Sequence, residues 1–259
     1  MAIPVAAPAA GVWRAAGRCR HPLTDAIPLG HLVTPVPAAY PAAMSIALHE
    51  TLEVRWFLPD GHPCLARAQE WFVSAKRDRN RTDDYLLTGR DDLGIKARVA
   101  EDGSLRVETK YLAGSLGAMQ VAAGAVGKLE RWMKLSLPVG DPKPKKEGSW
   151  RSVEKERRLR TFEFQQGVVA EVPIDAQLRP EAGCGVELTR LRYRLDAASE
   201  LSVAWTLGFE AFGREVALLQ VLLATCSAAL AEHLRLELDA SCSMGYPAWL
   251  LTTARDRRR

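Results

Sequence analysis

Basic and acidic side chains alternate with apolar ones along residues 94–111, GIKARVAEDGSLRVETKY. A period of two is typical of β-strands, whose successive side chains point to opposite faces of a sheet. Residues 101–104, EDGS, have the composition of a tight turn, so the segment is predicted to form a hairpin. One face of this hairpin would carry four cations and one carboxylate: Lys96, Arg98, Arg106, Glu108 and Lys110.

Such a face either meets solvent or lines a cavity that binds a polyanion. Solvent exposure is the usual arrangement for the charged face of a single hairpin. In a cavity, the basic groups would hold phosphates through charge-assisted hydrogen bonds, and the carboxylates would hold a divalent cation. The choice depends on whether other strands repeat the pattern.

The alternation recurs in the segment 45–58, which precedes the hairpin. There Thr51, Glu53 and Arg55 share one face, whereas the opposite face is apolar. Further strands are predicted at residues 85–87, 150–164, 168–174, 185–194 and 201–212. Glu187 and Glu210 alternate with apolar neighbours in the last two of these strands. Charged faces therefore repeat over several strands, which favours the cavity.

The register of the segment 150–164 stays open. Lys155 and Arg157 share one of its faces, and Arg158 and Arg160 share the other. Because both faces carry cations, alternation alone does not decide which pair points into the cavity.

Apolar residues at helical spacing predict three helices, over residues 63–74, 118–135 and 216–235. The proline- and lysine-rich segment 138–148 is predicted to connect two halves of one domain, because neither half has enough strands to close a core. About eight strands and three helices predict an α+β fold, an antiparallel β-barrel or tunnel with flanking helices. The charged faces would point inward, where each charge needs a partner, an ion or a ligand.

Composition narrows the class of protein. The chain has 259 residues, of which 47% are hydrophobic and 25% are charged, as in soluble globular proteins. Five cysteines without a CxxC pair argue against a zinc site and favour a reducing cytoplasm. The most apolar run, residues 216–231, is shorter than the roughly 20 residues that cross a membrane, so no membrane partner is expected. Nucleic acid is not expected either, although binding to an outer basic surface stays open as an alternative.

Both ends of the chain differ from its middle. Residues 1–43 are rich in Ala and Pro and lack sustained periodicity, so a disordered extension is expected. Met44, just before the first predicted strand, is a candidate for the native start of the chain. Residues 252–259 are expected to form a basic tail.

A series of short segments resembles, in order, the CYTH superfamily, the triphosphate tunnel metalloenzymes. They are LEVRW, DDYLL, LGIKARV, LRVETKYL, VEKERRLRTF, VELT and GFEAF. This family includes thiamine triphosphatases and class IV adenylate cyclases. The resemblance implies a single tunnel domain over residues 44–251 that binds a small-molecule triphosphate or polyphosphate together with Mg²⁺ or Mn²⁺.

Carried over by position, the resemblance implies two groups of site residues and assigns no catalytic residue. The phosphate-binding group is Arg55, Lys96, Arg98, Lys110, Lys155 and Arg157, with Arg158 and Arg160 as the other register. The metal-binding group is Glu53, Glu108, Glu187 and Glu210.

The opening motif departs from the family's Glu-x-Glu-x-Lys, because Thr51 replaces the first carboxylate and Arg55 replaces the lysine. Arginine binds phosphate well, so this departure bears on metal-dependent catalysis more than on binding. Two hypotheses follow. The first is a metal-dependent hydrolase of a triphosphate bound in a basic β-tunnel. The second is a non-catalytic phosphoanhydride or polyphosphate binder of the same fold.

Overall fold

The computed structural model describes residues 47–100, 103–139, 149–174, 180–196 and 199–255. The extension predicted at residues 1–43 lies outside the described residues. So do residues 140–148 of the predicted connector and residues 256–259 of the predicted tail. Within the described residues, no helix is both long enough and apolar enough to cross a membrane.

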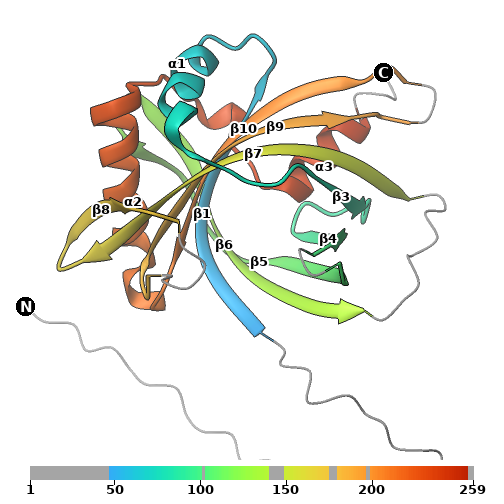
Figure 1. The fold of residues 1–259 in the computed structure, drawn as a ribbon, viewed down its shortest axis with the longest axis horizontal. Helices are drawn as coiled ribbons and strands as arrows, with labels where there is room; N and C mark the ends of the chain where they lie inside the picture. Colours follow the sequence, from blue (N-terminus) through green and yellow to red (C-terminus); the bar gives the residue numbers. More distant parts are fainter. Residues whose placement is uncertain (1–46, 101–102, 140–148, 175–179, 197–198, 256–259) are drawn as a thin grey trace, which may run out of the picture. The chain divides into compact units, whose positions relative to one another are not determined.

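Ten strands in the described part of the chain form one antiparallel sheet that closes on itself (Figure 1). They are β1 (Ala47–Pro59), β2 (Lys76–Arg77), β3 (Arg81–Leu86), β4 (Leu93–Val99), β5 (Leu105–Ala122), β6 (Ala125–Val139), β7 (Trp150–Gln165), β8 (Val168–Val172), β9 (Gly183–Tyr193) and β10 (Ser202–Phe212). Eight strands form a ring in the order β7-β3-β4-β5-β6-β1-β10-β9, and β9 pairs with β7 to close it. The short strands β2 and β8 also pair with β7. The predicted α+β fold, an antiparallel barrel with flanking helices, is confirmed.

Three α-helices occur in the described residues: α1 (Cys64–Trp71), α2 (Leu218–Cys226) and α3 (Tyr246–Arg255). Three short helical turns, η1 (Phe72–Ser74), η2 (Glu215–Ala217) and η4 (Ala240–Cys242), and the π-helix η3 (Ser227–Leu234) accompany them in the described residues. The helix predicted at residues 63–74 is confirmed by α1 and η1, and η2, α2 and η3 together cover the one predicted at residues 216–235. The helix α3 was not predicted.

The helix predicted at residues 118–135 is wrong. The end of β5 and most of β6 lie there, joined by a tight turn at Ala123 and Gly124. Gly124 has a φ of +76°, a conformation that glycine adopts without strain. The Ala-rich composition favours a helix, but β6 pairs with both β5 and β1, so the closed sheet satisfies its backbone groups on both edges.

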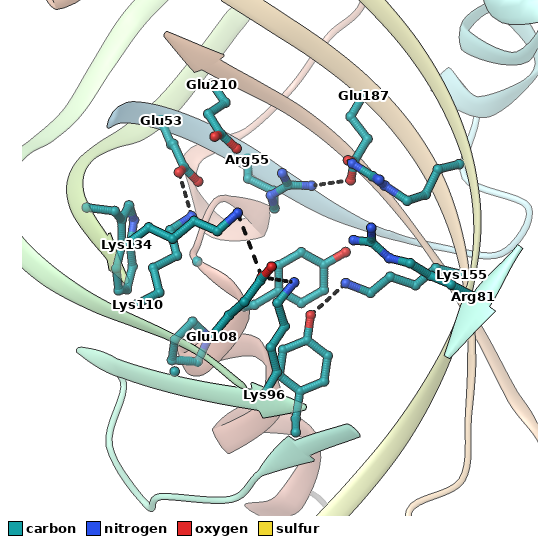
Figure 2. Close-up of a pocket in the computed structure, with 17 residues that line it drawn as sticks. Glu53, Arg55, Arg81, Lys96, Glu108, Lys110, Lys134, Lys155, Glu187 and Glu210 are labelled. Atoms are coloured by element: carbon teal, nitrogen blue, oxygen red, sulfur yellow. Dashed lines mark hydrogen bonds and ion pairs between the residues drawn. The ribbon is translucent and has the colours of Figure 1, made fainter. Parts of the chain in front are cut away.

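The two faces of β1 show how the barrel separates apolar from polar side chains. Leu52, Val54 and Trp56 point outward and are almost completely buried in a core that includes residues of α1 and α2. Glu53 and Arg55 point into the barrel (Figure 2). The period of two thus places a covered apolar core outside the sheet and charged groups inside it.

One end of the barrel interior is packed with apolar side chains from five strands and from α3. This cluster, the apolar end, consists of Phe57, Tyr85, Val153, Leu191, Ala204, Trp249 and Leu250. The ring of Trp249 stacks on that of Phe57, with centroids 4.8 Å apart and an interplanar angle of 8°. The helix α3 therefore forms a second core with the inner face of the strands.

Candidate functional site

The interior beyond the apolar end contains a cavity of about 130 Å³, the ionic chamber (Figure 2). Seven basic side chains line it: Arg55, Arg81, Lys96, Lys110, Lys134, Lys155 and Arg157. Four carboxylates line it as well: Glu53, Glu108, Glu187 and Glu210. A single water needs roughly 10–15 Å³ by the same measure, so the chamber has room for a much larger ligand.

Arg55 reaches from β1 across β10 to β9. Its guanidinium lies over Gly208, where an added Cβ would come within 2.5 Å of the guanidinium carbon. Because no side chain stands there, Arg55 reaches both Glu187 and Thr206 at 3.2 Å. Arg157 Nε donates to the other oxygen of Glu187 at 2.8 Å. Burial alone would raise the pKa of Glu187, but Arg157 and Arg55 lower it well below its usual value.

The hairpin predicted at residues 94–111 corresponds to β4 and the first part of β5. Lys96 and Glu108 are opposite each other in the register, and their charged groups are 2.8 Å apart. Arg98 Nε donates to the same carboxylate, also at 2.8 Å. Burial opposes the charge on Glu108, but Lys96 and Lys134 hold the pKa of this carboxyl well below its usual value.

The charged face of this hairpin extends from the chamber to its mouth. Gly94, at the start of β4, packs against Pro247 of α3, so Arg98 lies toward the end of the barrel that is away from α3. Arg98 and Arg106 line an outer cavity there, which shares Glu108 with the chamber. Among the predicted phosphate-binding residues, Arg98 is therefore a residue of the mouth rather than of the chamber wall.

The structure resolves the register of β7. Lys155 and Arg157 line the chamber. Arg160 points outward, and its guanidinium carbon lies 4.4 Å from the centroid of the Trp71 ring. Arg158 donates to the carbonyl of Phe72 at 3.2 Å. The outward arginines thus hold α1 and η1 against the outside of the barrel.

Asp83 is a buried carboxylate at the site that was not predicted. It contacts three cations: Lys155 at 3.0 Å, Lys96 at 3.3 Å and Arg81 at 3.2 Å. Burial opposes its charge, yet these cations hold the pKa of Asp83 far below its usual value. A signal for it existed, because Arg81, Asp83 and Tyr85 alternate along β3 in the same way as the charged residues of β4.

Lys155 lies beside Asp83 at the boundary with the apolar end. Its side chain is only 4% exposed, and its Nζ donates to the Tyr85 hydroxyl at 2.6 Å. Burial lowers the pKa of Lys155 to about 8, although Asp83 acts in the opposite direction. This cation therefore loses its charge at mildly alkaline pH.

Lys134 and Trp132 also line the chamber, and neither was predicted because β6 was interpreted as a helix. Lys134 lies 3.7 Å from Glu108. Trp132 Nε1 donates to Glu130 at 3.1 Å, and Lys110 Nζ lies 5.3 Å from the centroid of the indole ring. The alternation within residues 129–135, LERWMKL, was the sequence signal that could have identified this segment as a strand with Trp132 and Lys134 on one face.

The four predicted metal ligands have different surroundings. Glu108 and Glu187 are each held by at least two cations. Glu53 accepts a hydrogen bond from Lys110 at 2.5 Å, whereas no hydrogen bond or ion pair joins the side-chain carboxylate of Glu210 to any described residue. Glu53 and Glu210 are opposite each other in the register of β1 and β10. Among the residues that the structure describes, no group of three metal-binding side chains occurs.

The charge of the chamber is unbalanced even after its internal ion pairs are counted. Seven cations face six carboxylates when Asp83 and Glu130, which contact lining residues, are included with the four of the lining, and this leaves an excess of positive charge. Lysine and arginine side chains only donate hydrogen bonds. The arrangement therefore suits a small anion that has many acceptor oxygens.

The solved structures that are similar to this chain have low TM-scores and low sequence identity. The RNA triphosphatase domain of a mimivirus mRNA capping enzyme is 11% identical, with a TM-score of 0.43 and coverage of 74% of this chain and 89% of that one. A conserved hypothetical protein from Pyrococcus furiosus is 10% identical, with a TM-score of 0.40 and coverage of 76% and 98%. An RNA triphosphatase of S. pombe is 11% identical, with a TM-score of 0.36 and coverage of 82% and 86%.

No family model matches the chain, and no curated protein matches it significantly. Structural similarities at 10–11% identity assign neither a ligand nor a reaction to this chain. Its function has to be inferred from the geometry and charge of the ionic chamber.

Proposed function

We propose that the ionic chamber binds a triphosphate, inorganic or organic, and that the protein hydrolyses it with a divalent cation. The observation that carries this proposal is the convergence of basic side chains from several strands on one cavity with an excess of positive charge. A triphosphate supplies several negative charges and many acceptor oxygens in one short chain, which matches such a set of donors.

The cations are held in place before any ligand arrives. Arg55 and Arg157 share Glu187, and Lys96 contacts both Asp83 and Glu108. Donors fixed in this way lose little side-chain entropy when they bind a phosphate oxygen. In this proposal the carboxylates Glu108 and Glu187 orient cations, and Arg98 guides the phosphate chain at the mouth of the chamber. The assignment of Glu108 and Glu187 as metal ligands stays a prediction.

Glu53 and Glu210 are the candidates for holding Mg²⁺ or Mn²⁺. Mg²⁺ is usually bound by one or two carboxylates together with water and substrate phosphates, and this neighbouring pair fits such a set. The bound ion would offset negative charge on the phosphoryl oxygens. Because two carboxylates form an incomplete set, the triphosphate itself would complete the ligands of the ion.

Phosphate release from tripolyphosphate, thiamine triphosphate and nucleoside triphosphates, with Mg²⁺ or Mn²⁺, tests the hydrolase proposal. We expect release from at least one of them, and loss of release with EDTA or with Glu53→Gln. The matched control is Glu154→Gln, at a half-exposed carboxylate outside the chamber lining, which should leave the rate unchanged. A folded protein that releases phosphate from none of these substrates would rule out catalysis.

The second candidate function is binding without hydrolysis. Thr51, where the resembling family has a carboxylate, favours it, as does the lack of three grouped metal ligands among the described residues. Calorimetry with tripolyphosphate distinguishes the two. Binding that EDTA does not change supports the non-catalytic protein, and binding that strictly requires a metal contradicts it.

A further inference from the structure

The apolar end closes the barrel interior on one side of the ionic chamber. Side chains from β1, β3, β7, β9 and β10 meet Trp249 and Leu250 of α3 there. Trp249 is 5% exposed and Leu250 is 4% exposed, so the packing leaves these residues almost no contact with solvent. Within the described residues, this packing closes the inner end of the chamber, so a phosphate chain that enters from the mouth would stop against it.

Tyr246 forms the boundary between the two halves of the interior. It begins α3, lines the chamber and packs against the apolar end. Its ring meets Phe57 edge-on, with centroids 5.2 Å apart, and lies parallel to Tyr85 with centroids 5.7 Å apart. Lys155 Nζ lies 4.0 Å from the centroid of the Tyr246 ring. These contacts hold the ring, and with it the hydroxyl, in one position.

The hydroxyl of Tyr246 is buried and has no hydrogen-bond partner among the described residues. Burial raises the pKa of Tyr246, so the hydroxyl keeps its proton and remains a donor. Its cationic neighbours Lys155 and Arg55 carry only donors, and they cannot accept its proton. A buried donor without a partner is costly, by about 1–3 kcal/mol, unless a ligand supplies the acceptor.

We propose that Tyr246 recognises the terminal phosphoryl group of an oligophosphate chain that enters the ionic chamber end-on and stops at the apolar end. This inference rests on the proposed binding of a triphosphate and adds that the protein recognises the free end of that triphosphate. The hydroxyl donates to an oxygen of the free end, and Lys155 neutralises its charge. Any esterified end stays toward the mouth, where Arg98 and Arg106 lie. The substrate class is therefore an oligophosphate with at least one free end.

Calorimetry on the full chain with three probes tests the inference. Tripolyphosphate has two free ends, ATP has one, and diadenosine tetraphosphate has none. We expect the wild type to bind the first two and to bind diadenosine tetraphosphate at least about tenfold more weakly, since the blocked chain loses a hydrogen bond to a charged group. Tyr246→Phe should weaken tripolyphosphate by about tenfold or more for the same reason.

Tyr246→Phe keeps the ring, so its melting temperature should equal or exceed that of the wild type, since an unpartnered donor is removed. The matched control is Tyr111→Phe, at a tyrosine that is 47% exposed, which should bind tripolyphosphate like the wild type. Equal binding of the blocked and free chains, or unchanged binding by Tyr246→Phe, would overturn the inference while leaving triphosphate binding intact. A wild type that binds none of the probes would overturn both.

Discussion

Five strands, β1, β3, β7, β9 and β10, line both the ionic chamber and the apolar end, yet the two have opposite chemistry. On β1, Glu53 and Arg55 face the chamber, and Phe57, the next inward residue, belongs to the apolar end. On β7 the change falls between Lys155 and Val153. Because these five strands run unbroken through both halves, the type of their inward side chains separates a binding cavity from a packed core along each of them.

This difference assigns a distinct role to each half. Burial of apolar surface at the apolar end stabilises the barrel, by roughly 25 cal/mol for each Å² removed from water. The chamber keeps charges in a partly dry interior, where desolvation offsets much of the attraction between ion pairs. We infer that the apolar end supplies stability and that the chamber is maintained for a ligand.

The largest effect is expected from a change at the apolar end. Trp249→Ala should lower the free energy of unfolding by about 3–5 kcal/mol, because a large cavity replaces the stacked indole. Urea denaturation measures it. Tyr111→Ala, at an exposed tyrosine of β5, is the control and should cost less than about 1 kcal/mol. Equal losses in the two variants would contradict the role given to the apolar end.

A change in the chamber should affect stability and ligand response together. Asp83→Asn leaves Lys155, Lys96 and Arg81 without their shared carboxylate, and it should lower the free energy of unfolding by about 3 kcal/mol. Tripolyphosphate should then raise the melting temperature of the variant more than that of the wild type, because it supplies the missing negative charge.

Asp92→Asn is the matched control for Asp83→Asn. Asp92 pairs with Arg90 at 2.6 Å on the exposed surface, where ion pairs contribute little. Its melting temperature should stay at the wild-type value, with and without tripolyphosphate. If the ligand shifts Asp83→Asn no further than the wild type, the phosphate chain does not reach this cluster.

Loss of one chamber cation should weaken binding, and it also removes a partner from the buried Glu187. Arg157→Met should raise the dissociation constant for tripolyphosphate by about 10- to 100-fold, since a hydrogen bond to a charged group is lost. Calorimetry measures this constant. Arg131→Met is the control, because Arg131 pairs with Glu50 and Glu215 outside the chamber lining. Similar constants for the two variants would place the ligand elsewhere.

The smallest effect is expected from pH. The pKa of Lys155, about 8, lies below the usual lysine value, so its charge is lost as the pH rises through 8. Affinity for tripolyphosphate should then fall by up to about tenfold between pH 7 and pH 9. Lys155→Arg keeps its charge throughout this range and should show a flatter profile. Parallel profiles for the two proteins would exclude Lys155 from binding.

The lowered pKa of Lys155 affects stability in the opposite direction from affinity. Lys155 gives up its proton near pH 8 in the folded protein, whereas in the unfolded chain it keeps the proton to a higher pH. Between these values the unfolded state binds more protons, so this group makes the folded state more stable as the pH rises. A loss of affinity above pH 8 would therefore not reflect unfolding caused by Lys155.

Much of the barrel could be predicted because alternation is a local signal. The hairpin of β4 and β5 and the charged face of β1 both follow from a period of two in the sequence. The error at residues 118–135 has the same local origin, since Ala-rich residues at helical spacing resemble a helix when read alone. Only pairing with strands on both sides, β5 and β1, makes β6 a strand.

The candidate site was predictable in part for a related reason. Cations with a clear alternation, such as Arg55 and Lys96, were named from sequence and line the chamber. Asp83 and Lys134 were missed, because one lies on a short strand and the other on the strand that was interpreted as a helix. Tyr246 lies on α3, which no local pattern had indicated.

The sequence by itself determined which side chains share a strand face, because that depends only on the backbone between neighbouring residues. Tertiary structure alone decided which charges meet. Arg55 and Glu187 are 132 residues apart and come together only because β1, β10 and β9 lie side by side in the closed ring. Closure also let α3 fill one end of the interior, which gave the chamber a floor at Tyr246. Contacts of this range depend on the packing of the whole chain, and no local pattern encodes them.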